Sequence, residues 1–290
     1  MKQKKIQNFG GFPKEFCQYD SSKIIILPIP FDKTSTWMKG ADKGPKAIID
    51  ASPNLEFYDI ETDSEVYKNG IFTAEEIDEK DSISMIKKVN ESTKKFLDDE
   101  KFVVLIGGEH SISIGAINAF ADHYKNIGIL HLDAHSDRRE SYEGSKYNHA
   151  CVIARAQEVS SNIVSVGIRS MDSSELKNAN KDSIFFAQDI HDSDSWIKDA
   201  VKKLPNNVYI TIDLDVFDPS ILPSTGTPEP GGMDWYSVLK LLKAVSDSKN
   251  IVGFDVVELC PSKVNKAPDF ISAKLIYTLL SYKFCKKNEK

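Results

Sequence analysis

Two short stretches of the sequence carry carboxylates and an imidazole at spacings suited to metal binding. Asp133, His135 and Asp137 are spaced i, i+2 and i+4, and Asp213 and Asp215 repeat the i, i+2 spacing. On an extended segment, alternate residues point to the same side, so each stretch would present its side chains together. A single aspartate at a strand end usually caps a turn, whereas the repeated pattern favours one shared site.

A further candidate, His110, follows Gly107 and Gly108, which would let the backbone turn sharply at a strand end. Four crowded carboxylates repel one another and cannot be buried without compensation, but two divalent cations would neutralise them. Carboxylates and imidazoles without thiolates suit Mn²⁺ better than structural zinc. Two such ions, about 3.5–4 Å apart, can activate a water for hydrolysis of a polar carbon centre. The predicted metal ligands are His110, Asp133, His135, Asp137, Asp213 and Asp215.

These residues belong to segments that share one form, a buried strand ending in polar, mostly acidic residues. The segments are VVLIGGEHS (103–111), ILHLDAHSD (129–137), YITIDLDVFDP (209–219) and IVGFDVVELCP (251–261). In an open parallel sheet, ligands bind beyond the carboxyl ends of the strands. We therefore expect the four polar ends to meet at one edge of the sheet.

Continuous apolar runs alternate with amphipathic segments along the chain, which is typical of a parallel sheet with helices on both faces. The pattern predicts one α/β domain over residues 1–290, with residues 61–82 as an acidic surface excursion. The expected strands are 23–29, 101–107, 126–132, 163–168, 183–187, 207–214 and 251–257; the expected helices are 44–51, 111–124, 149–159, 193–203, 234–248 and 270–284.

Composition narrows the class of protein. The formal net charge is −6 and the lysines are scattered, which argues against a nucleic-acid partner. No segment approaches the roughly 20 apolar residues of a membrane span, and no signal-peptide pattern is present. The four cysteines form no C-x-x-C pair, so we expect reduced thiols in a cytoplasmic protein, with Cys151 as a buried structural thiol.

Other polar residues leave alternatives open. His149, in KYNHACVIARA, could be a general acid or proton shuttle, or a surface histidine at a helix start. Glu258 could bind a cationic group, or cap a helix or form a salt bridge. Asp255 could support the same site or cap a neighbouring element. His131, within its strand, is interpreted as a satisfied core histidine.

The motifs GGEHS, LDAHSD, TIDLDVFDPS, STGTPEPGG and FDVVELCP resemble those of the ureohydrolase family, which contains arginase and agmatinase. The resemblance runs from FDKTSTWMKGADKGPKAI (31–48) to PDFISAKLIYTLL near the end of the chain. It implies a three-layer α/β/α arginase-like fold with a mostly parallel sheet of about eight strands. It also implies two Mn²⁺ ions, a small cationic guanidino substrate, and a homo-oligomer, either a trimer or a hexamer.

The resemblance also assigns residue roles. One metal ion would be held by His110, Asp133, Asp137 and Asp213, and the other by Asp133, His135, Asp213 and Asp215, so Asp133 and Asp213 would bridge. His149 falls at the position of the family's proton-shuttling histidine, and Glu258 at that of the carboxylate that grips the guanidinium group. Asp137 would orient the attacking hydroxide.

Within the family, STGTPEPGG and KYNHACV resemble agmatinases, which implies hydrolysis of agmatine to putrescine and urea. ESYEGSKYN (140–148) does not match the segment with which arginases hold an α-amino acid. In contrast, Asp172 of GIRSMD falls near where arginases have an acidic residue. Ser224 stands where glycine is usual, which leaves the shape of its loop open. Glu109 stands where aspartate is commoner, and as a non-ligand it should tolerate the change.

Two kinds of alternative remain. The same site could give an arginase, a guanidinobutyrase or a formiminoglutamase. The chain could also be a catalytically silent metal-binding homologue with a regulatory role, which loss of a ligand, His149 or Glu258 would favour. The six predicted metal ligands, His149 and Glu258 are all present in the sequence.

Overall fold

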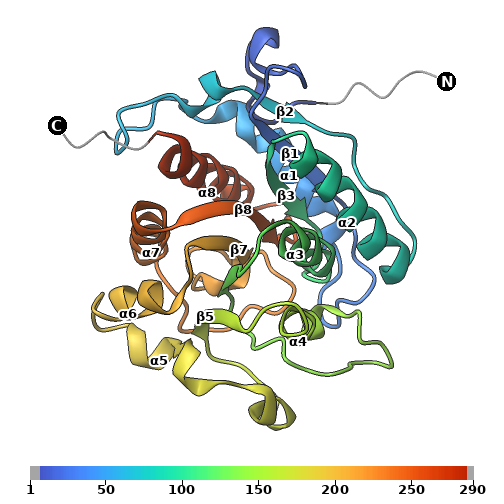
Figure 1. The fold of residues 1–290 in the computed structure, drawn as a ribbon, viewed down its shortest axis with the longest axis vertical. Helices are drawn as coiled ribbons and strands as arrows, with labels where there is room; N and C mark the ends of the chain where they lie inside the picture. The colour runs from blue at the N-terminus through green and yellow to red at the C-terminus, as the bar shows by residue number, and fades with distance from the viewer. Residues whose placement is uncertain (1–6, 286–290) are drawn as a thin grey trace.

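The computed structural model describes residues 7–285 and is built on one eight-stranded sheet, all of whose paired strands are parallel (Figure 1). The strand order across the sheet is β2-β1-β3-β8-β7-β4-β5-β6. The strands are β1 (Ile24–Ile29), β2 (Ile71–Thr73), β3 (Phe102–Gly107), β4 (Gly128–Leu132), β5 (Asn162–Ile168), β6 (Ile184–Phe186), β7 (Asn207–Asp213) and β8 (Asn250–Val257).

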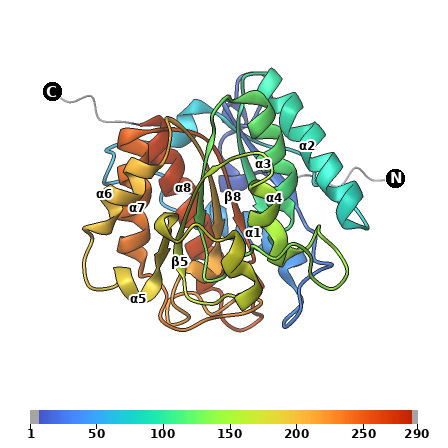
Figure 2. The same ribbon diagram turned by 60° about the horizontal axis from the view of Figure 1, so that its bottom comes forward.

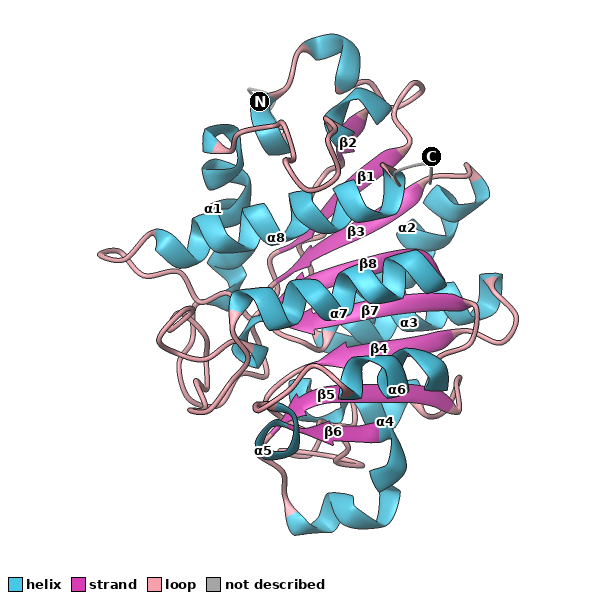
Figure 3. Ribbon diagram, turned by 90° about the vertical axis from the view of Figure 1, so that its left-hand side faces the viewer, coloured by secondary structure: helices cyan, strands magenta, loops and turns pink. Residues whose placement is uncertain are grey.

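Helices cover both faces of this sheet, which confirms the expected three-layer α/β/α fold (Figures 2 and 3). One face carries α1 (Gly44–Ala51), α5 (Ala187–Ile190), α6 (Trp196–Lys203), α7 (Trp235–Ser248) and α8 (Ala267–Phe284). The other face carries α2 (Ser82–Asp98), α3 (Ile112–His123) and α4 (Val152–Ala156). No helix within the described residues is both long and apolar enough to cross a membrane.

Burial on both faces explains the continuous apolar runs. Every residue of β1 and β3 is buried, so neither strand has the alternation of buried and exposed residues seen when one face meets water. Ile24 and Ile26 pack into the core beneath α1 and α8, whereas Ile25 and Leu27 pack into the core beneath α2 and α3. A strand between two helical layers needs apolar residues at both parities, which is the pattern seen in the sequence.

The expected strands and most expected helices are confirmed within about three residues of their ends. The prediction for residues 61–82 is wrong: the segment contains β2, which pairs with β1 at the edge of the sheet, and Ile71 and Thr73 are buried. The 17-residue helix α2 follows it, capped by Asp81, whose side chain accepts a hydrogen bond from Ser84 N. The helix expected over 149–159 is a 3₁₀ turn, His149–Cys151, followed by the short α4.

The strand order explains how the polar segments meet. β3, β8, β7 and β4 are consecutive neighbours in the middle of the sheet, so their carboxyl ends form one edge. Beneath that edge, a buried polar row crosses the sheet in register: Asp255 of β8, Thr211 of β7, His131 of β4 and Ser165 of β5. We call these four residues the polar row.

The two glycines before His110 serve a different purpose from the one expected. Neither lies in the left-handed backbone region, so a sharp turn is not the reason for them. A Cβ on Gly108 would lie 2.0 Å from the Phe31 carbonyl oxygen, and one on Gly107 would lie 2.6 Å from side-chain atoms of Ile112 and Val257. Glycine is required at position 108 because the chain after β1 passes directly against the end of β3, and at position 107 because the side chains of Ile112 and Val257 leave no room for a Cβ.

We predict that Gly108→Ala lowers the free energy of unfolding by about 3 kcal/mol or more, because a methyl group cannot be fitted against a backbone carbonyl without moving the chain. Guanidinium denaturation would measure it. Gly226→Ala is the control, since its Cβ would meet its nearest atom, the Met38 carbonyl oxygen, at 3.4 Å, an ordinary contact. Equal stability of the two variants would contradict the explanation.

Candidate active site

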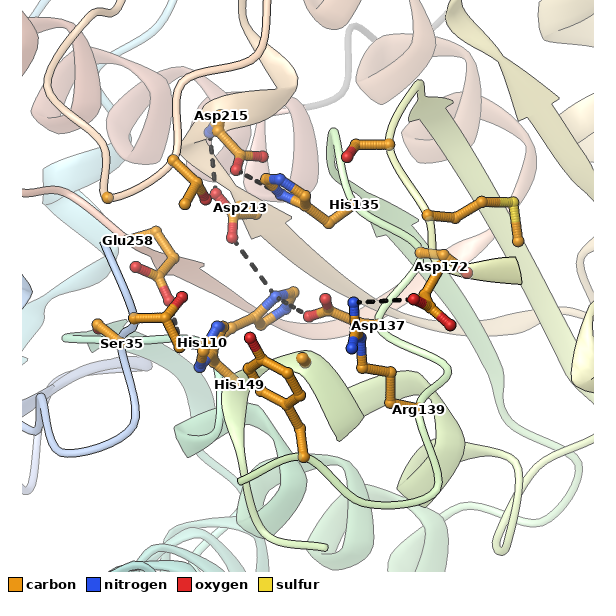
Figure 4. Close-up of a pocket in the computed structure, with 18 of the residues that line it drawn as sticks. Ser35, His110, His135, Asp137, Arg139, His149, Asp172, Asp213, Asp215 and Glu258 are labelled. Atoms are coloured by element: carbon orange, nitrogen blue, oxygen red, sulfur yellow. Dashed lines mark hydrogen bonds and ion pairs between the residues drawn. The ribbon is translucent and has the colours of Figure 1, made fainter. Parts of the chain in front are cut away.

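A pocket of about 250 Å³ opens at the carboxyl ends of the central strands (Figure 4). Glu258 and Asp172 lie on opposite sides of this pocket in the view drawn, with His110 and Asp137 between them. Asp133 is fully buried, and the other predicted site residues line the pocket: His110, His135, Asp137, His149, Asp172, Asp213, Asp215 and Glu258.

The turn after β7 brings two aspartates to the same place. Asp213, the last residue of β7, caps a 3₁₀ turn over Leu214–Val216, and its Oδ1 accepts a hydrogen bond from Asp215 N at 2.9 Å. Asp215 Oδ1 in turn accepts from Ala134 N at 2.9 Å, which ties this turn to the segment after β4. The i, i+2 spacing thus acts through a turn rather than through an extended strand.

The imidazole of His110 faces the carboxylates. Its Nδ1 lies 3.2 Å from Asp133 Oδ2, 3.1 Å from Asp137 Oδ2 and 3.5 Å from Asp213 Oδ2. This nitrogen is buried and makes a hydrogen bond to none of the described residues. A buried ring nitrogen without a partner, surrounded by carboxylate oxygens, is the arrangement expected of a metal ligand.

A second group lies beside the first. His135 Nδ1 is 2.9 Å from Asp215 Oδ2 and 3.5 Å from Asp133 Oδ1. The ligand atoms of Asp133, His135 and Asp215 lie close enough to hold one ion. Those of His110, His131, Asp133 and Asp137 lie close enough to hold another, and the predicted bridging ligand Asp213 belongs to neither group. Asp133 belongs to both groups, so the geometry allows a shared ligand.

The pKa values of the cluster show a lack of positive charge. Burial, with the neighbouring charge of Asp133, raises the pKa of Asp137 to about 6. Burial and the charges of Asp215 and Asp133 raise the pKa of Asp213 well above its usual value. Although burial opposes it, the carboxylates of Asp215 and Asp133 raise the pKa of His135 to about 12. Divalent cations would supply the missing charge, so the residues fit a metal centre.

The polar row supports these groups from below. His110 Nε2 lies 2.9 Å from Thr211 Oγ1, which donates to Asp255 Oδ1 at 2.7 Å. Tyr209 donates to the other oxygen of Asp255. Because the Thr211 hydrogen is directed to Asp255, Thr211 accepts the Nε2 hydrogen of His110 and leaves Nδ1 free for a ligand. Asp255, whose role the sequence left open, therefore supports the site.

His131 is a satisfied core histidine, as predicted, and it also positions a carboxylate. It is fully buried, with Nδ1 3.1 Å from Ser165 Oγ and Nε2 2.8 Å from Asp133 Oδ2. Burial lowers its pKa to about 4. Arg138 donates to Ser165 at 2.7 Å, so the serine hydrogen turns to Nδ1 and the neutral ring donates to Asp133 from Nε2.

Two residues of the pocket have a strained backbone. Asp137 has φ 53° and Glu258 has φ 67°, in the left-handed region that non-glycine residues rarely adopt. Such strain persists where the surrounding structure imposes it, commonly at functional sites. Glu258 directly follows β8 and Asp137 lies in the loop after β4, where the chain must turn while its side chains stay in the pocket.

Glu258 has a buried carboxylate with no cationic partner among the described residues. It is 8% exposed, and its Oε1 accepts a hydrogen bond from His110 N at 2.7 Å. Burial and the charge of Glu109 raise its pKa well above the usual value. Within residues 7–285 it is neither a helix cap nor the partner of a lysine or arginine, which leaves cation binding as the better interpretation.

His149 begins the 3₁₀ turn that Asn148 caps, as the loop–helix interpretation required, and its side chain is 20% exposed. Burial, followed by the charges of His110 and His135, lowers its pKa to about 4, so the ring is neutral at neutral pH. Cys151, two residues on, is buried and its pKa is raised to about 11 by burial, which agrees with a structural thiol and not a nucleophile.

Asp172 lies on the pocket wall, but its carboxylate already has protein partners. It caps the 3₁₀ helix Ser173–Asn178, accepting from Ser174 N at 2.9 Å, and lies 3.6 Å from Arg139 Nη2 (Figure 4). Arg139 also approaches Glu175 and stacks on the Tyr142 ring. Ser224, buried nearby, does not line the pocket, and its carbonyl accepts from Cys260 N at 2.8 Å.

Sequence reasoning missed three contributors: Thr211, the pocket arginine Arg139, and Thr34, which contacts His149. The sequence contained a signal for Thr211, because it places a hydroxyl inside a mostly apolar strand. It contained no signal for Arg139 or Thr34, because each gains its role only from a contact made in the folded chain.

Comparison with known proteins identifies the family and the fold. The Arginase family model matches residues 22–281. An N(1)-aminopropylagmatine ureohydrolase from Synechocystis is 33% identical, over 94% of this chain and 95% of the relative. An agmatinase from Pyrococcus horikoshii is also 33% identical, over 95% and 98%. The crystal structure of the agmatine ureohydrolase of Thermoplasma volcanium superposes with a TM-score of 0.86 at 32% identity, covering 96% of this chain and 94% of that one.

The fold and the site define a hydrolase of the three-layer α/β/α class with a metal-binding His/Asp cluster. The chain belongs to the arginase family. Its relatives are ureohydrolases, and the chain is accordingly an enzyme that hydrolyses guanidino compounds.

We predict that Thr211→Val weakens metal binding about 10- to 100-fold, because His110 loses the acceptor that holds its tautomer. Titration of metal-free protein with Mn²⁺, followed by the rise in melting temperature, would measure the affinity. Thr211→Ser keeps the hydroxyl and should bind as the wild type does. Unchanged affinity in Thr211→Val would show that the hydroxyl does not position His110.

Proposed function

We propose that the enzyme hydrolyses agmatine to putrescine and urea with two Mn²⁺ ions bound in the pocket. The observation that carries this proposal is the buried Glu258 carboxylate, which has no cationic partner among the described residues and lines the same pocket as the metal-binding cluster. A guanidinium group is planar and permanently charged, so a carboxylate can bind it through paired hydrogen bonds.

His110, Asp133, Asp137 and Asp213 would hold one ion, and Asp133, His135, Asp213 and Asp215 the other. The absence of thiolates among these donors supports Mn²⁺ over structural zinc. When bound, the ions supply a water that is deprotonated near neutral pH. This assignment makes Asp133 and Asp213 the shared ligands.

The chain's own residues would carry out the remaining steps. Glu258 binds and orients the guanidinium group. The Asp137 carboxylate accepts a hydrogen bond from the attacking water and directs it at the guanidinium carbon. His149, at the pocket wall, relays a proton between the leaving amine and solvent. Its low pKa keeps the ring neutral at neutral pH, with one nitrogen unprotonated.

The far wall of the pocket supports a substrate with a cationic tail. Asp172 and Glu175 both line it, and Arg139 neutralises only one of these two charges. Asp172 would bind the distal amine of the substrate. A second candidate is N(1)-aminopropylagmatine, because relatives from Synechocystis, Thermus thermophilus and Thermococcus kodakarensis are ureohydrolases of that compound. Arginine, guanidinobutyrate and formiminoglutamate remain weaker alternatives.

We further propose that the chain acts as one domain, in a cytoplasmic homo-oligomer of three or six copies. The support for one domain is that the site draws on residues from Ser35 to Glu258. The support for the oligomer is the family resemblance of the sequence.

In a direct assay of urea release with Mn²⁺ present, we expect turnover of agmatine or N(1)-aminopropylagmatine and little turnover of arginine, whose carboxylate would face the acidic wall. The same assay on guanidinobutyrate tests whether Arg139 favours an anionic tail. Robust urea release from arginine alone would overturn the proposed substrate class.

Replacing a shared ligand should abolish both metal loading and activity. Asp213→Ala removes a carboxylate assigned to both ions, so we expect bound metal to fall and urea release to reach background. Metal content by elemental analysis and the urea assay would be measured together. Asp247→Ala, an exposed aspartate paired with Lys243 on α7, is the matched control and should be unaffected. Retained activity in Asp213→Ala would refute the ligand assignment.

A further inference from the structure

The loop after β1 places a threonine hydroxyl against the proposed proton-relaying histidine. Thr34 Oγ1 accepts a hydrogen bond from His149 N at 2.9 Å and lies 3.2 Å from Nδ1 of the same ring. Its third neighbour is Oε2 of Glu109, to which the hydroxyl donates. Thr34, Glu109 and His149 are separated by up to 115 residues and meet only at this point.

The loop that carries Thr34 is held firmly in place. Phe31 O accepts from Glu109 N and Ile29 O accepts from Gly108 N, both at 2.8 Å, so the chain after β1 is bonded to the end of β3. Asp32 Oδ2 accepts from Gly40 N at 2.6 Å and from Ala41 N at 3.2 Å, which closes the other end of the loop. The hydroxyl of Thr34 is therefore positioned before any substrate binds.

Hydrogen-bond valence then determines the direction of each bond. A hydroxyl has one hydrogen and two lone pairs. Glu109 is fully buried, and its Oε1 accepts from Ser111 Oγ at 2.9 Å while Oε2 accepts from Thr34. Burial raises the pKa of Glu109 to about 7, so above that pH Glu109 is a carboxylate that accepts a hydroxyl hydrogen on each oxygen. The single hydrogen of Thr34 is thus directed to Glu109, and its lone pairs must accept from His149, one from the backbone N–H and one from the ring.

We infer that Thr34, oriented by the Glu109 carboxylate, holds neutral His149 in the tautomer that carries its hydrogen on Nδ1. The lone pair is then on Nε2, the nitrogen on the far side of the ring from Thr34, which is left for the pocket. If the threonine hydrogen pointed at Nδ1 instead, Nε2 would carry the hydrogen and could accept none. Thr34 and Glu109 are positioning residues in this scheme, and Thr34 acts only through His149.

This inference rests on the proposed role of His149, and it gives Glu109 a purpose. The sequence predicted only that a non-ligand at position 109 would tolerate change. The geometry instead gives its charge and reach a part in orienting His149, because a shorter or neutral side chain would not direct the Thr34 hydrogen in the same way.

The test is a set of substitutions assayed for urea release above pH 8, on the guanidino substrate that the wild type turns over. Thr34→Val, which keeps the shape and removes the hydroxyl, should lower kcat about tenfold or more with KM unchanged. Thr34→Ser keeps the hydroxyl and should stay close to the wild type. Glu109→Gln, of equal size, should also lower kcat. Metal content should remain that of the wild type in all three, whereas the melting temperature of Thr34→Val should fall, because the His149 N–H and the Glu109 carboxylate each lose a hydrogen-bond partner.

A double-mutant cycle separates positioning from a general structural effect. In a His149→Ala background, Thr34→Val should cause no further fall in kcat, because its only route of action is gone. The inference is overturned if Thr34→Val lowers kcat by the same factor with and without His149, or if Thr34→Ser is as impaired as Thr34→Val. Absence of urea release by the wild type, or full activity of His149→Ala, would instead locate the failure in the proposed function.

Discussion

Four aspartates and two imidazoles are held together at the carboxyl ends of β3, β7 and β4, three of the four central strands, and nearly all of them are out of contact with water. Burial alone opposes the charged forms of Asp137 and Asp213, and their mutual repulsion opposes them further. The cluster can be stable in its working form only with added positive charge. The rest of the site follows from this need, since every supporting group orients a ligand toward a shared cation rather than toward water.

The support comes from a polar row that crosses an otherwise apolar sheet. Thr211 and Asp255 hold His110, and His131 with Ser165 holds Asp133, so each key ligand has a hydrogen-bonded partner beneath it. Polar groups at this depth are costly unless all are satisfied. Here they are satisfied by one another, because parallel register places their side chains side by side on the same face of the sheet.

Substrate choice depends on a different part of the molecule. The metal cluster and Glu258 lie on strand ends, whereas Trp37, Tyr142, Asp172 and Thr227 reach the pocket from loops. Strand ends are fixed by the sheet, but loops can change length and sequence without disturbing it. The strand-end residues therefore identify the reaction class, whereas the choice of substrate depends on the loops. In the proposed function, the charges of Arg139, Asp172 and Glu175 distinguish substrates with a cationic tail from those with an anionic one.

The sequence by itself determined the strands other than β2, most helices and the residues that gather in the pocket, because continuous apolar runs and the i, i+2 spacing of Asp133, His135, Asp213 and Asp215 are local patterns. It did not predict β2, whose three residues become a strand only by pairing with β1. Nor could it show why Gly108 is required, or that Thr34 and Glu109 meet His149. Those facts depend on which segments the strand order makes neighbours, and contacts across 75 to 115 residues leave no local pattern to detect.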